Sequence, residues 1–270
     1  MRGSLRYIIA LLIAGFSLLS YWCNRQENPV TGEVQHVDMT TEEEIALGLQ
    51  AAPQMAQQYG GLHPDQQARA AIDRIGQELV RASGAANSPY KFNFHLLADE
   101  NTINAFALPG GQVFITAGLL KNMTTEGQVA GVLAHEIGHV IGRHSAEQLA
   151  KTKLTQGLAG AAGIAAYDPE RPGASVANAA VAAAIAKVVS LRFGREDELE
   201  SDRLAVKYTA EAGYDPRSMI RVMQVLESKG GGGGGPEFLS THPNPGNRIG
   251  VLEQEIAEAY PSGVPTGLKQ

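Results

Sequence analysis

The chain has 270 residues, of which 44% are hydrophobic, so it can bury one sizeable core or two small ones. Its formal net charge of -6 offers no basic surface of the kind that binds nucleic acid. The one cysteine, Cys23, excludes an internal disulfide and a cysteine-based zinc cluster, so a metal site here must use histidines and carboxylates.

The N-terminus has the pattern of a targeting segment. Arg2 and Arg6 precede an apolar run at residues 7–19. Positive charge before such a run keeps this end cytoplasmic and sends the rest across a membrane. The bulky Tyr21 and its neighbour stand where a signal-peptide cleavage site needs small residues. We expect residues 1–23 to be an uncleaved membrane anchor, with a signal peptide as the alternative because the run is short for a full span.

A single domain is expected after a short linker. Residues 24–39 are polar and turn-rich, which predicts a tether, residues 40–262 form the domain, and residues 263–270 form a tail. The domain begins with a helix to about residue 58, for which Thr41 and Glu44 have capping-box spacing. A second helix begins near Pro64 and carries one apolar stripe: Ala68, Ile72, Ile75, Leu79 and Val80.

Three short strand-like runs precede a long helix. They lie at 91–97, 104–108 and 111–118, and the last two are separated by Pro-Gly-Gly, which predicts a small sheet with a hairpin. Thr125 and Gln128 have the spacing to cap the helix that follows. Helix-forming residues continue well beyond Gly142, so no break is expected there.

The second half of the domain is predicted to be helical. Two alanine- and glycine-rich segments, 155–166 and 174–190, fit tightly packed helices better than a mobile cover over a site. Further helices are expected at about 195–212, ending at Gly213, at about 216–228, and at the C-terminus as far as Tyr260. Six glycines at 230–235 predict a flexible loop.

The helix after the sheet contains HEIGHVIGRH at 135–144, a candidate metal site. His135 and His139 are four residues apart, so one helix face presents both to the same ion. Glu136 is turned by about 100° from His135, which lets it address a metal-bound water rather than the metal. Zinc lowers the pKa of such a water, and a nearby carboxylate can take its proton as it attacks a carbonyl.

His144 is a tempting third ligand, but the spacing opposes it. Nine residues of helix place it on the face opposite His135. In the longer motif HExxHxxGxxH the last histidine falls three residues after the glycine, and here that position is Ser145. We therefore expect His144 to cap, pack or hydrogen-bond near the site instead of binding metal.

A better third ligand lies about sixty residues downstream. Glu198 and Asp202 are four apart, so a glutamate could complete a His/His/Glu site while the aspartate accepts the ring N–H of a bound histidine. Glu196 and Glu200 are rivals by position, but neither has a carboxylate four residues further on. Taken alone, this acidic cluster would be read as a solvated helix face.

Four motifs in this order resemble metallopeptidase family forty-eight. They are HEIGH at 135–139, ExxxD at 198–202, NAFALPGG upstream at 104–111 and STHPNPGNRI downstream at 240–249. The resemblance covers most of the chain after about residue 40. It implies an α+β, mostly helical gluzincin fold with a small sheet and one Zn²⁺ between two helices. It also implies that the run at 111–118 is an edge strand that pairs with extended substrate.

The resemblance assigns a role to each matching residue. It makes His135, His139 and Glu198 the zinc ligands and Glu136 the general base, with Asp202 and Arg248 supporting them. His242 matches a histidine that faces the metal, where it either stabilises the oxyanion or plugs the fourth zinc position. For His242 and Arg248 nearly all the weight comes from the resemblance.

The expected function is that of a zinc endopeptidase on the periplasmic side of a bacterial envelope, either exported or held at the membrane by its N-terminal segment. Its partners would be misfolded or extended polypeptides, because backbone pairing selects for extension rather than for one sequence. The alternative is a zinc-containing, largely latent module that binds unfolded clients with little turnover. Occupancy of the fourth zinc position by His242 distinguishes the two.

Overall fold

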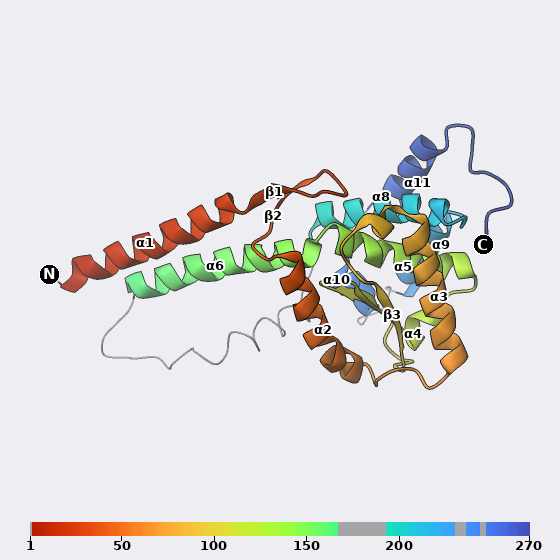
Figure 1. Cartoon of the computed structure of the whole chain (residues 1–270), viewed down its shortest axis with the longest axis horizontal. Helices are drawn as coiled ribbons and strands as arrows, with labels where there is room; N and C mark the ends of the chain where they lie inside the picture. Colours follow the sequence, from red (N-terminus) through yellow and green to blue (C-terminus); the bar gives the residue numbers. More distant parts are fainter. Residues whose placement is uncertain (1, 167–192, 230–235, 244–246) are drawn as a thin grey trace.

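A computed structural model describes residues 2–166, 193–229, 236–243 and 247–270 (Figure 1). Helices dominate these residues and surround one small three-stranded sheet, which confirms the mostly helical α+β fold. The alanine-rich segment predicted at 174–190 and the glycine loop predicted at 230–235 lie outside the described residues.

The sheet has the order β3 (Asn93–Leu97), β5 (Gln112–Thr116), β4 (Ala105–Leu108). β4 and β5 are antiparallel, as the predicted hairpin requires, while β3 pairs with β5 in parallel. The expectation that the run at 111–118 is an edge strand is therefore wrong. β5 lies in the centre because β3 occupies its second side, and β4, an edge strand, precedes the turn at 109–111.

Two helices precede the sheet. In α2 (Thr41–Gln58) the capping box is formed by Thr40 and Glu43, one residue before the predicted pair. The predicted partner Glu44 is instead buried, where it accepts hydrogen bonds from Tyr90 and Arg143. Helix α3 (Gln66–Ala82) has Asp65 as its N-cap, and its predicted apolar stripe packs on the core. The short 3-10 helix η1 (Gly84–Asn87) follows it.

Helix α5 (Glu126–Ile141) runs through the centre of the domain. Thr125 and Gln128 form its capping box, as predicted, and every residue from 127 to 141 is buried. Helix α5 lies against α3, α8 (Arg195–Glu211) and α9 (Ser218–Lys229) (Figure 1). A side chain on Gly138 would start 3.0 Å from the Cα of Ser201, so this glycine permits the close approach of α8 to α5. Within the described residues, the body also contains α4 (Ala117–Leu120), α10 (Glu237–Thr241) and α11 (Arg248–Ala259).

The helix carrying the histidines breaks where no break was predicted. α5 ends at Ile141, and α6 (His144–Ala166) begins after Arg143, whose φ of 56° lies in the left-handed region. Partners distant in sequence hold this turn. Asn28 donates to the carbonyl of Ile141, and Gln35 donates to that of Gly142, each at 2.8 Å. These bonds satisfy carbonyls at the end of α5, so the helix can stop without leaving them unpaired.

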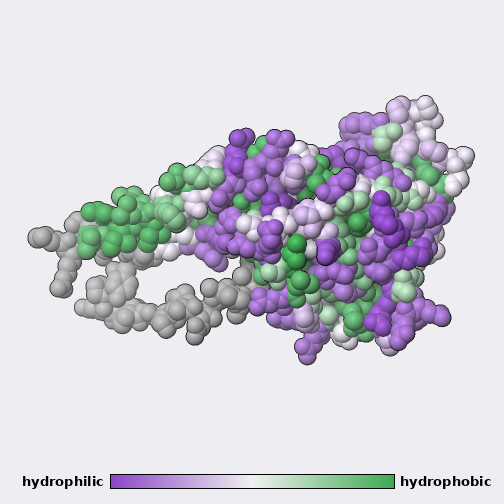
Figure 2. Space-filling model, in the orientation of Figure 1, coloured by the Kyte–Doolittle hydropathy of each residue, from purple (hydrophilic) through white to green (hydrophobic). Residues whose placement is uncertain are grey.

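The N-terminal segment is helical and extends away from the body. α1 (Arg2–Cys23) lies alongside α6 (Figure 1), and its side chains Leu11, Leu12 and Phe16 are each at least 67% exposed. Figure 2 shows this apolar surface along the projecting helix. None of the helices within the described residues is long and apolar enough to span a bilayer.

Residues 24–39, expected to be a tether, contain the antiparallel strands β1 (Arg25–Glu27) and β2 (Val34–His36). The turn between them places Asn28 against the end of α5, and β2 brings Gln35 there as well. This segment therefore contributes to the packing around the histidine helix.

The last residues of the chain pack on the body through Asp215. This buried carboxylate accepts hydrogen bonds from Arg217 at 2.7 Å and from Gln270 at 2.9 Å. Burial raises the pKa of Asp215, but the bonds from Arg217 and Gln270 outweigh it and lower the pKa to about 2.

Replacing this carboxylate should give a pH-dependent loss of stability. Because its folded pKa lies below the unfolded value, Asp215 contributes stability above about pH 4 that is lost as pH falls towards 2. We expect Asp215→Asn to lower the free energy of unfolding by about 1–2 kcal/mol at pH 7, allowing for the half-exposed Arg217. Denaturant melts at pH 7 and pH 2 measure this, with Glu211→Gln as control. An equal loss at both pH values would contradict it.

Candidate metal centre

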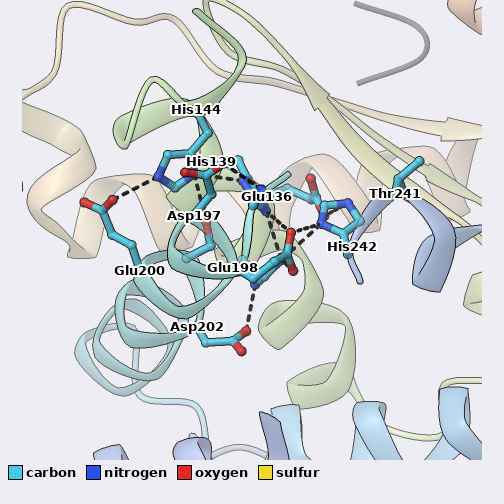
Figure 3. A network of polar contacts seen from close by, with 12 residues as sticks. Glu136, His139, His144, Asp197, Glu198, Glu200, Asp202, Thr241 and His242 are labelled. Carbon is cyan, nitrogen blue, oxygen red and sulfur yellow. Dashed lines mark hydrogen bonds and ion pairs between the residues drawn. The ribbon is translucent and has the colours of Figure 1, made fainter. Parts of the chain in front are cut away.

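Four ligand atoms converge at the contact between α5 and α8. They belong to His135, His139, Glu198 and His242, and all lie within 4.8 Å of one another. Figure 3 shows three of these residues: His139, Glu198 and His242. Each of these side chains is at most 1% exposed. α5 presents its two histidines from one face, as their spacing predicted, and α8 supplies the glutamate across the contact at Gly138.

The distances suit a zinc ion among these groups. The Nε2 atoms of His135 and His139 face each other at 3.1 Å, and Glu198 Oε1 lies 3.4 Å from the Nε2 of His139. Two imidazole nitrogens and a carboxylate directed at one buried point are the ligand set of a catalytic zinc site. The residues present therefore fit the metal that the motif predicted.

Electrostatics also favours a cation at this point. Burial and the charge of Arg248 lower the pKa of His135, but hydrogen bonds with Asp202 and Glu198 raise it to about 9 overall. Burial likewise raises the pKa of Glu198, yet the surrounding histidines hold it well below its ordinary value. Burial lowers the pKa of His139, which keeps that imidazole neutral and able to bind metal.

Asp202 and Arg248 contact two of the candidate ligands, His135 and Glu198. Asp202 Oδ1 lies 2.9 Å from the Nδ1 of His135, so it can accept that ring proton and leave Nε2 free. Arg248, only 1% exposed at the start of α11, donates to Asp202 at 2.6 Å and pairs with Glu198 at 2.9 Å. The family resemblance predicts a supporting role for both residues, and these contacts place them beside the candidate ligands.

Glu136 is buried beside the cluster without joining it. Neither of its carboxylate oxygens has a hydrogen-bond partner among the described residues, although His242 Nε2 lies 3.6 Å from Oε1. Burial raises the pKa of Glu136 above that of an ordinary glutamate. An unpartnered carboxylate with a raised pKa is suited to accept a proton near neutral pH.

His242 follows α10 and points into the ligand group. Its ring stacks on Phe238 with centroids 4.4 Å apart, and its Nδ1 lies 3.0 Å from Glu198 Oε1. It is fully buried. This places a fourth ligand-type nitrogen within 4.8 Å of the other three ligand atoms.

The remaining candidates fall outside the ligand group. His144 touches His139 and Glu200 but does not belong to the four, as its predicted role near the site required. Glu196 is exposed. Sequence reasoning missed Phe193, which stacks on His139 with ring centroids 3.9 Å apart. No local pattern marks this contact, since it depends on how the start of α8 packs against α5.

A mostly helical domain with a small sheet, an HExxH helix and a glutamate from a second helix defines a gluzincin-type metallopeptidase domain. The model of peptidase family M48 matches residues 66–256, and the chain belongs to this family. The matched region contains all four residues of the metal group.

Relatives of the chain come from bacteria and mitochondria. The beta-barrel assembly-enhancing protease of Escherichia coli is 29% identical over 70% of this chain and 39% of its own length. The mitochondrial metalloendopeptidase OMA1 of Schizosaccharomyces pombe is 27% identical over 94% of this chain and 73% of its own. The OMA1 protein of Arabidopsis thaliana is 34% identical over 59% of this chain and 30% of its own. The chain spans about half or less of the length of the bacterial relatives.

Proposed function

We propose that this chain is a zinc-dependent endopeptidase that hydrolyses extended or misfolded polypeptides. The observation that supports this proposal is a buried group of ligand atoms from His135, His139 and Glu198. It lies beside the carboxylate of Glu136, whose oxygens have no hydrogen-bond partner among the described residues. In this proposal one zinc ion is held by the first three residues, and residues 40–262 form the peptidase domain. Relatives named as a beta-barrel assembly-enhancing protease and a metalloendopeptidase support a role in protein quality control.

The proposed chemistry divides between the metal and the protein. When bound, zinc would lower the pKa of a water molecule and polarise the carbonyl of the peptide bond. Glu136 takes the proton of the attacking water and passes it to the leaving nitrogen, a role that its raised pKa favours. Asp202 fixes the tautomer of His135, and Arg248 holds Asp202 in place. When displaced from the ligand group, His242 could donate to the oxyanion.

We propose that extended substrate pairs with β4, the edge strand that borders the metal group. Phe106 and Leu108 of this strand line a pocket that also contains Tyr59, Phe193 and His242. Backbone pairing along β4 would select for an extended chain, and the apolar pocket would favour an apolar side chain next to the cleaved bond. Phe106 is only 8% exposed and His242 is fully buried, so the site must open before a substrate can bind.

We also propose a location in the bacterial cell envelope, on its periplasmic side. The support is the basic N-terminus followed by the apolar run at 7–19, which is the pattern of an export signal. The relatives include mitochondrial as well as bacterial proteins, so this proposal is based on the export pattern.

Cleavage of an unfolded protein tests the proposed activity. We expect the full chain with zinc to digest casein while sparing a stably folded protein of similar size, and a chelator should abolish digestion. Fragment patterns on gels and mass spectrometry of the new termini measure this. If no unfolded substrate is cut with zinc present, or if a chelator leaves cleavage unchanged, the peptidase proposal fails.

The position of His242 favours a second candidate function, a latent zinc module that binds unfolded clients with little turnover. The imidazole sits in the ligand group with no exposed surface, as a plug of the fourth zinc position would. Removal of the His242 side chain separates the two functions. A peptidase that His242 keeps latent would gain activity, whereas a module that only binds unfolded clients would not.

A further inference from the structure

The turn between α5 and α6 directs His144 back towards the metal group. The left-handed backbone at Arg143 interrupts the helix, so His144 does not continue the face that a straight helix would give it. A Cβ on Gly142 would lie 2.4 Å from the Nε2 of His144, and only glycine leaves room for the ring. His144 is consequently buried, with 2% exposure.

His144 connects a metal ligand to a carboxylate. Its Nδ1 lies 2.9 Å from the Nδ1 of His139, and its Nε2 lies 2.9 Å from Glu200 Oε2 (Figure 3). Glu200 comes from α8, the helix that also carries Glu198 and Asp202. Helix α8 therefore supplies the candidate ligand Glu198 and one supporting carboxylate for each histidine ligand. Asp202 serves His135, and Glu200 serves His139 through His144.

The direction of these hydrogen bonds follows from the metal site. If His139 binds metal through Nε2, its proton must be on Nδ1, which then donates to the Nδ1 of His144. That nitrogen of His144 can accept only when the proton of its own ring is on Nε2, where it donates to Glu200. We infer that His144 and Glu200 are positioning residues that hold His139 in the tautomer and orientation required for metal binding.

The two histidine ligands are thus supported in different ways. His135 donates directly to Asp202, whereas His139 reaches its carboxylate through an inserted imidazole. The inserted ring depends on the turn at Arg143, which is held by residues between 28 and 44. Glu44 pairs with the Arg143 guanidinium, which also donates to the carbonyl of Met39 at 2.8 Å. The relay therefore links Met39 and Glu44 to a metal ligand.

The affinity of the full chain for zinc tests the relay. We expect His144→Leu to raise the zinc dissociation constant about 10- to 100-fold, because His139 loses the acceptor of its ring proton. His144→Asn should bind more tightly than His144→Leu, since its amide oxygen can accept from His139 near the place of Nδ1. Glu200→Ala should weaken binding by less than His144→Leu. His95→Leu is the matched control, a half-buried histidine in the sheet away from the site. Competition with a chelator measures each constant.

Two further readouts separate positioning from a general loss of packing. Thermal unfolding of the metal-free proteins shows whether each variant folds, and the visible spectrum of the cobalt-substituted proteins reports ligand geometry. Glu200→Ala combined with His144→Leu should bind zinc no more weakly than His144→Leu alone, because Glu200 acts only through His144. If folded His144→Leu binds zinc like the wild type, or if the two changes add fully, the relay is refuted. Should His144→Leu not fold, the order of His144→Asn and Glu200→Ala against wild type decides in its place, and wild-type affinity in both refutes the relay.

This inference rests on the proposed zinc site but not on peptidase activity. A wild-type chain that binds no zinc would defeat the site itself. A wild type that binds zinc but cuts nothing would defeat only the proposed activity, and the relay would still be tested by the affinities.

Discussion

Replacing Glu136 by glutamine is expected to reduce cleavage of casein by about 10²- to 10⁴-fold, the range in which a positioned general base contributes. Glutamine keeps the shape of the side chain but cannot accept the proton of the attacking water. Both carboxylate oxygens lack hydrogen-bond partners among the described residues, so little of the local structure depends on the charge. The loss should therefore appear in kcat, while KM changes little.

Zinc content and a matched variant control this experiment. Glu136 is not one of the four grouped ligands, so Glu136→Gln should retain about one zinc per chain. Glu196→Gln makes the same change at an exposed position of α8 and should leave cleavage unchanged. If Glu136→Gln digests casein as fast as the wild type, the general-base role is wrong. Loss of zinc together with activity would show that Glu136 supports the metal instead.

Much of the site could be predicted because the residues that mark it lie close to one another in the sequence. The i, i+4 spacing of His135 and His139 places both on one helix face, and the same spacing singles out Glu198 with Asp202 on a second helix. The capping residues Thr125 and Gln128 likewise mark the start of α5 without any knowledge of the fold. Each of these predictions depends on residues within one helical turn.

The errors occur where long-range contacts decide the structure. The break after Ile141 depends on Asn28 and Gln35, which are more than 100 residues away and which no local propensity registers. The central place of β5 likewise depends on parallel pairing with β3, and strand order cannot be read from alternation in single strands. Arg248 and His242 could be assigned only through similarity to the family, since a histidine before a proline indicates only a turn and an arginine in a last helix is usually solvated.

The break also changes the meaning of His144. A continuous helix would place it opposite His135, and the spacing argument correctly excludes it as a ligand. The turn at Arg143 instead brings it to the ring of His139, a position that neither the helix nor the longer zinc motif predicts. A residue that narrowly misses a known ligand pattern thus acquires a supporting role through tertiary structure.

Removing the His242 side chain is expected to raise the rate of casein cleavage. In the structure the His242 imidazole lies within the ligand group. In the proposed site, a substrate carbonyl can therefore reach the metal only after the imidazole moves. If the open state is populated at about 0.1–10%, His242→Ala raises the rate roughly 10- to 1,000-fold. The substitution should also loosen the contact with Phe238, whose ring stacks on it, and so favour opening of the segment around α10.

The direction of this change separates the two proposed functions of the chain. His63→Ala is the control for loss of a histidine away from the site, and His242→Ala combined with Glu136→Gln should be inactive if the added cleavage comes from the proposed centre. Initial rates on casein at equal zinc content measure all three variants. A fall in rate for His242→Ala would contradict latency and assign the imidazole to oxyanion stabilisation, which costs about 10²- to 10³-fold when one donor is lost. A rise would instead identify the buried, closed centre as a resting state of a peptidase that needs a trigger, because the chemistry was intact and only access was missing.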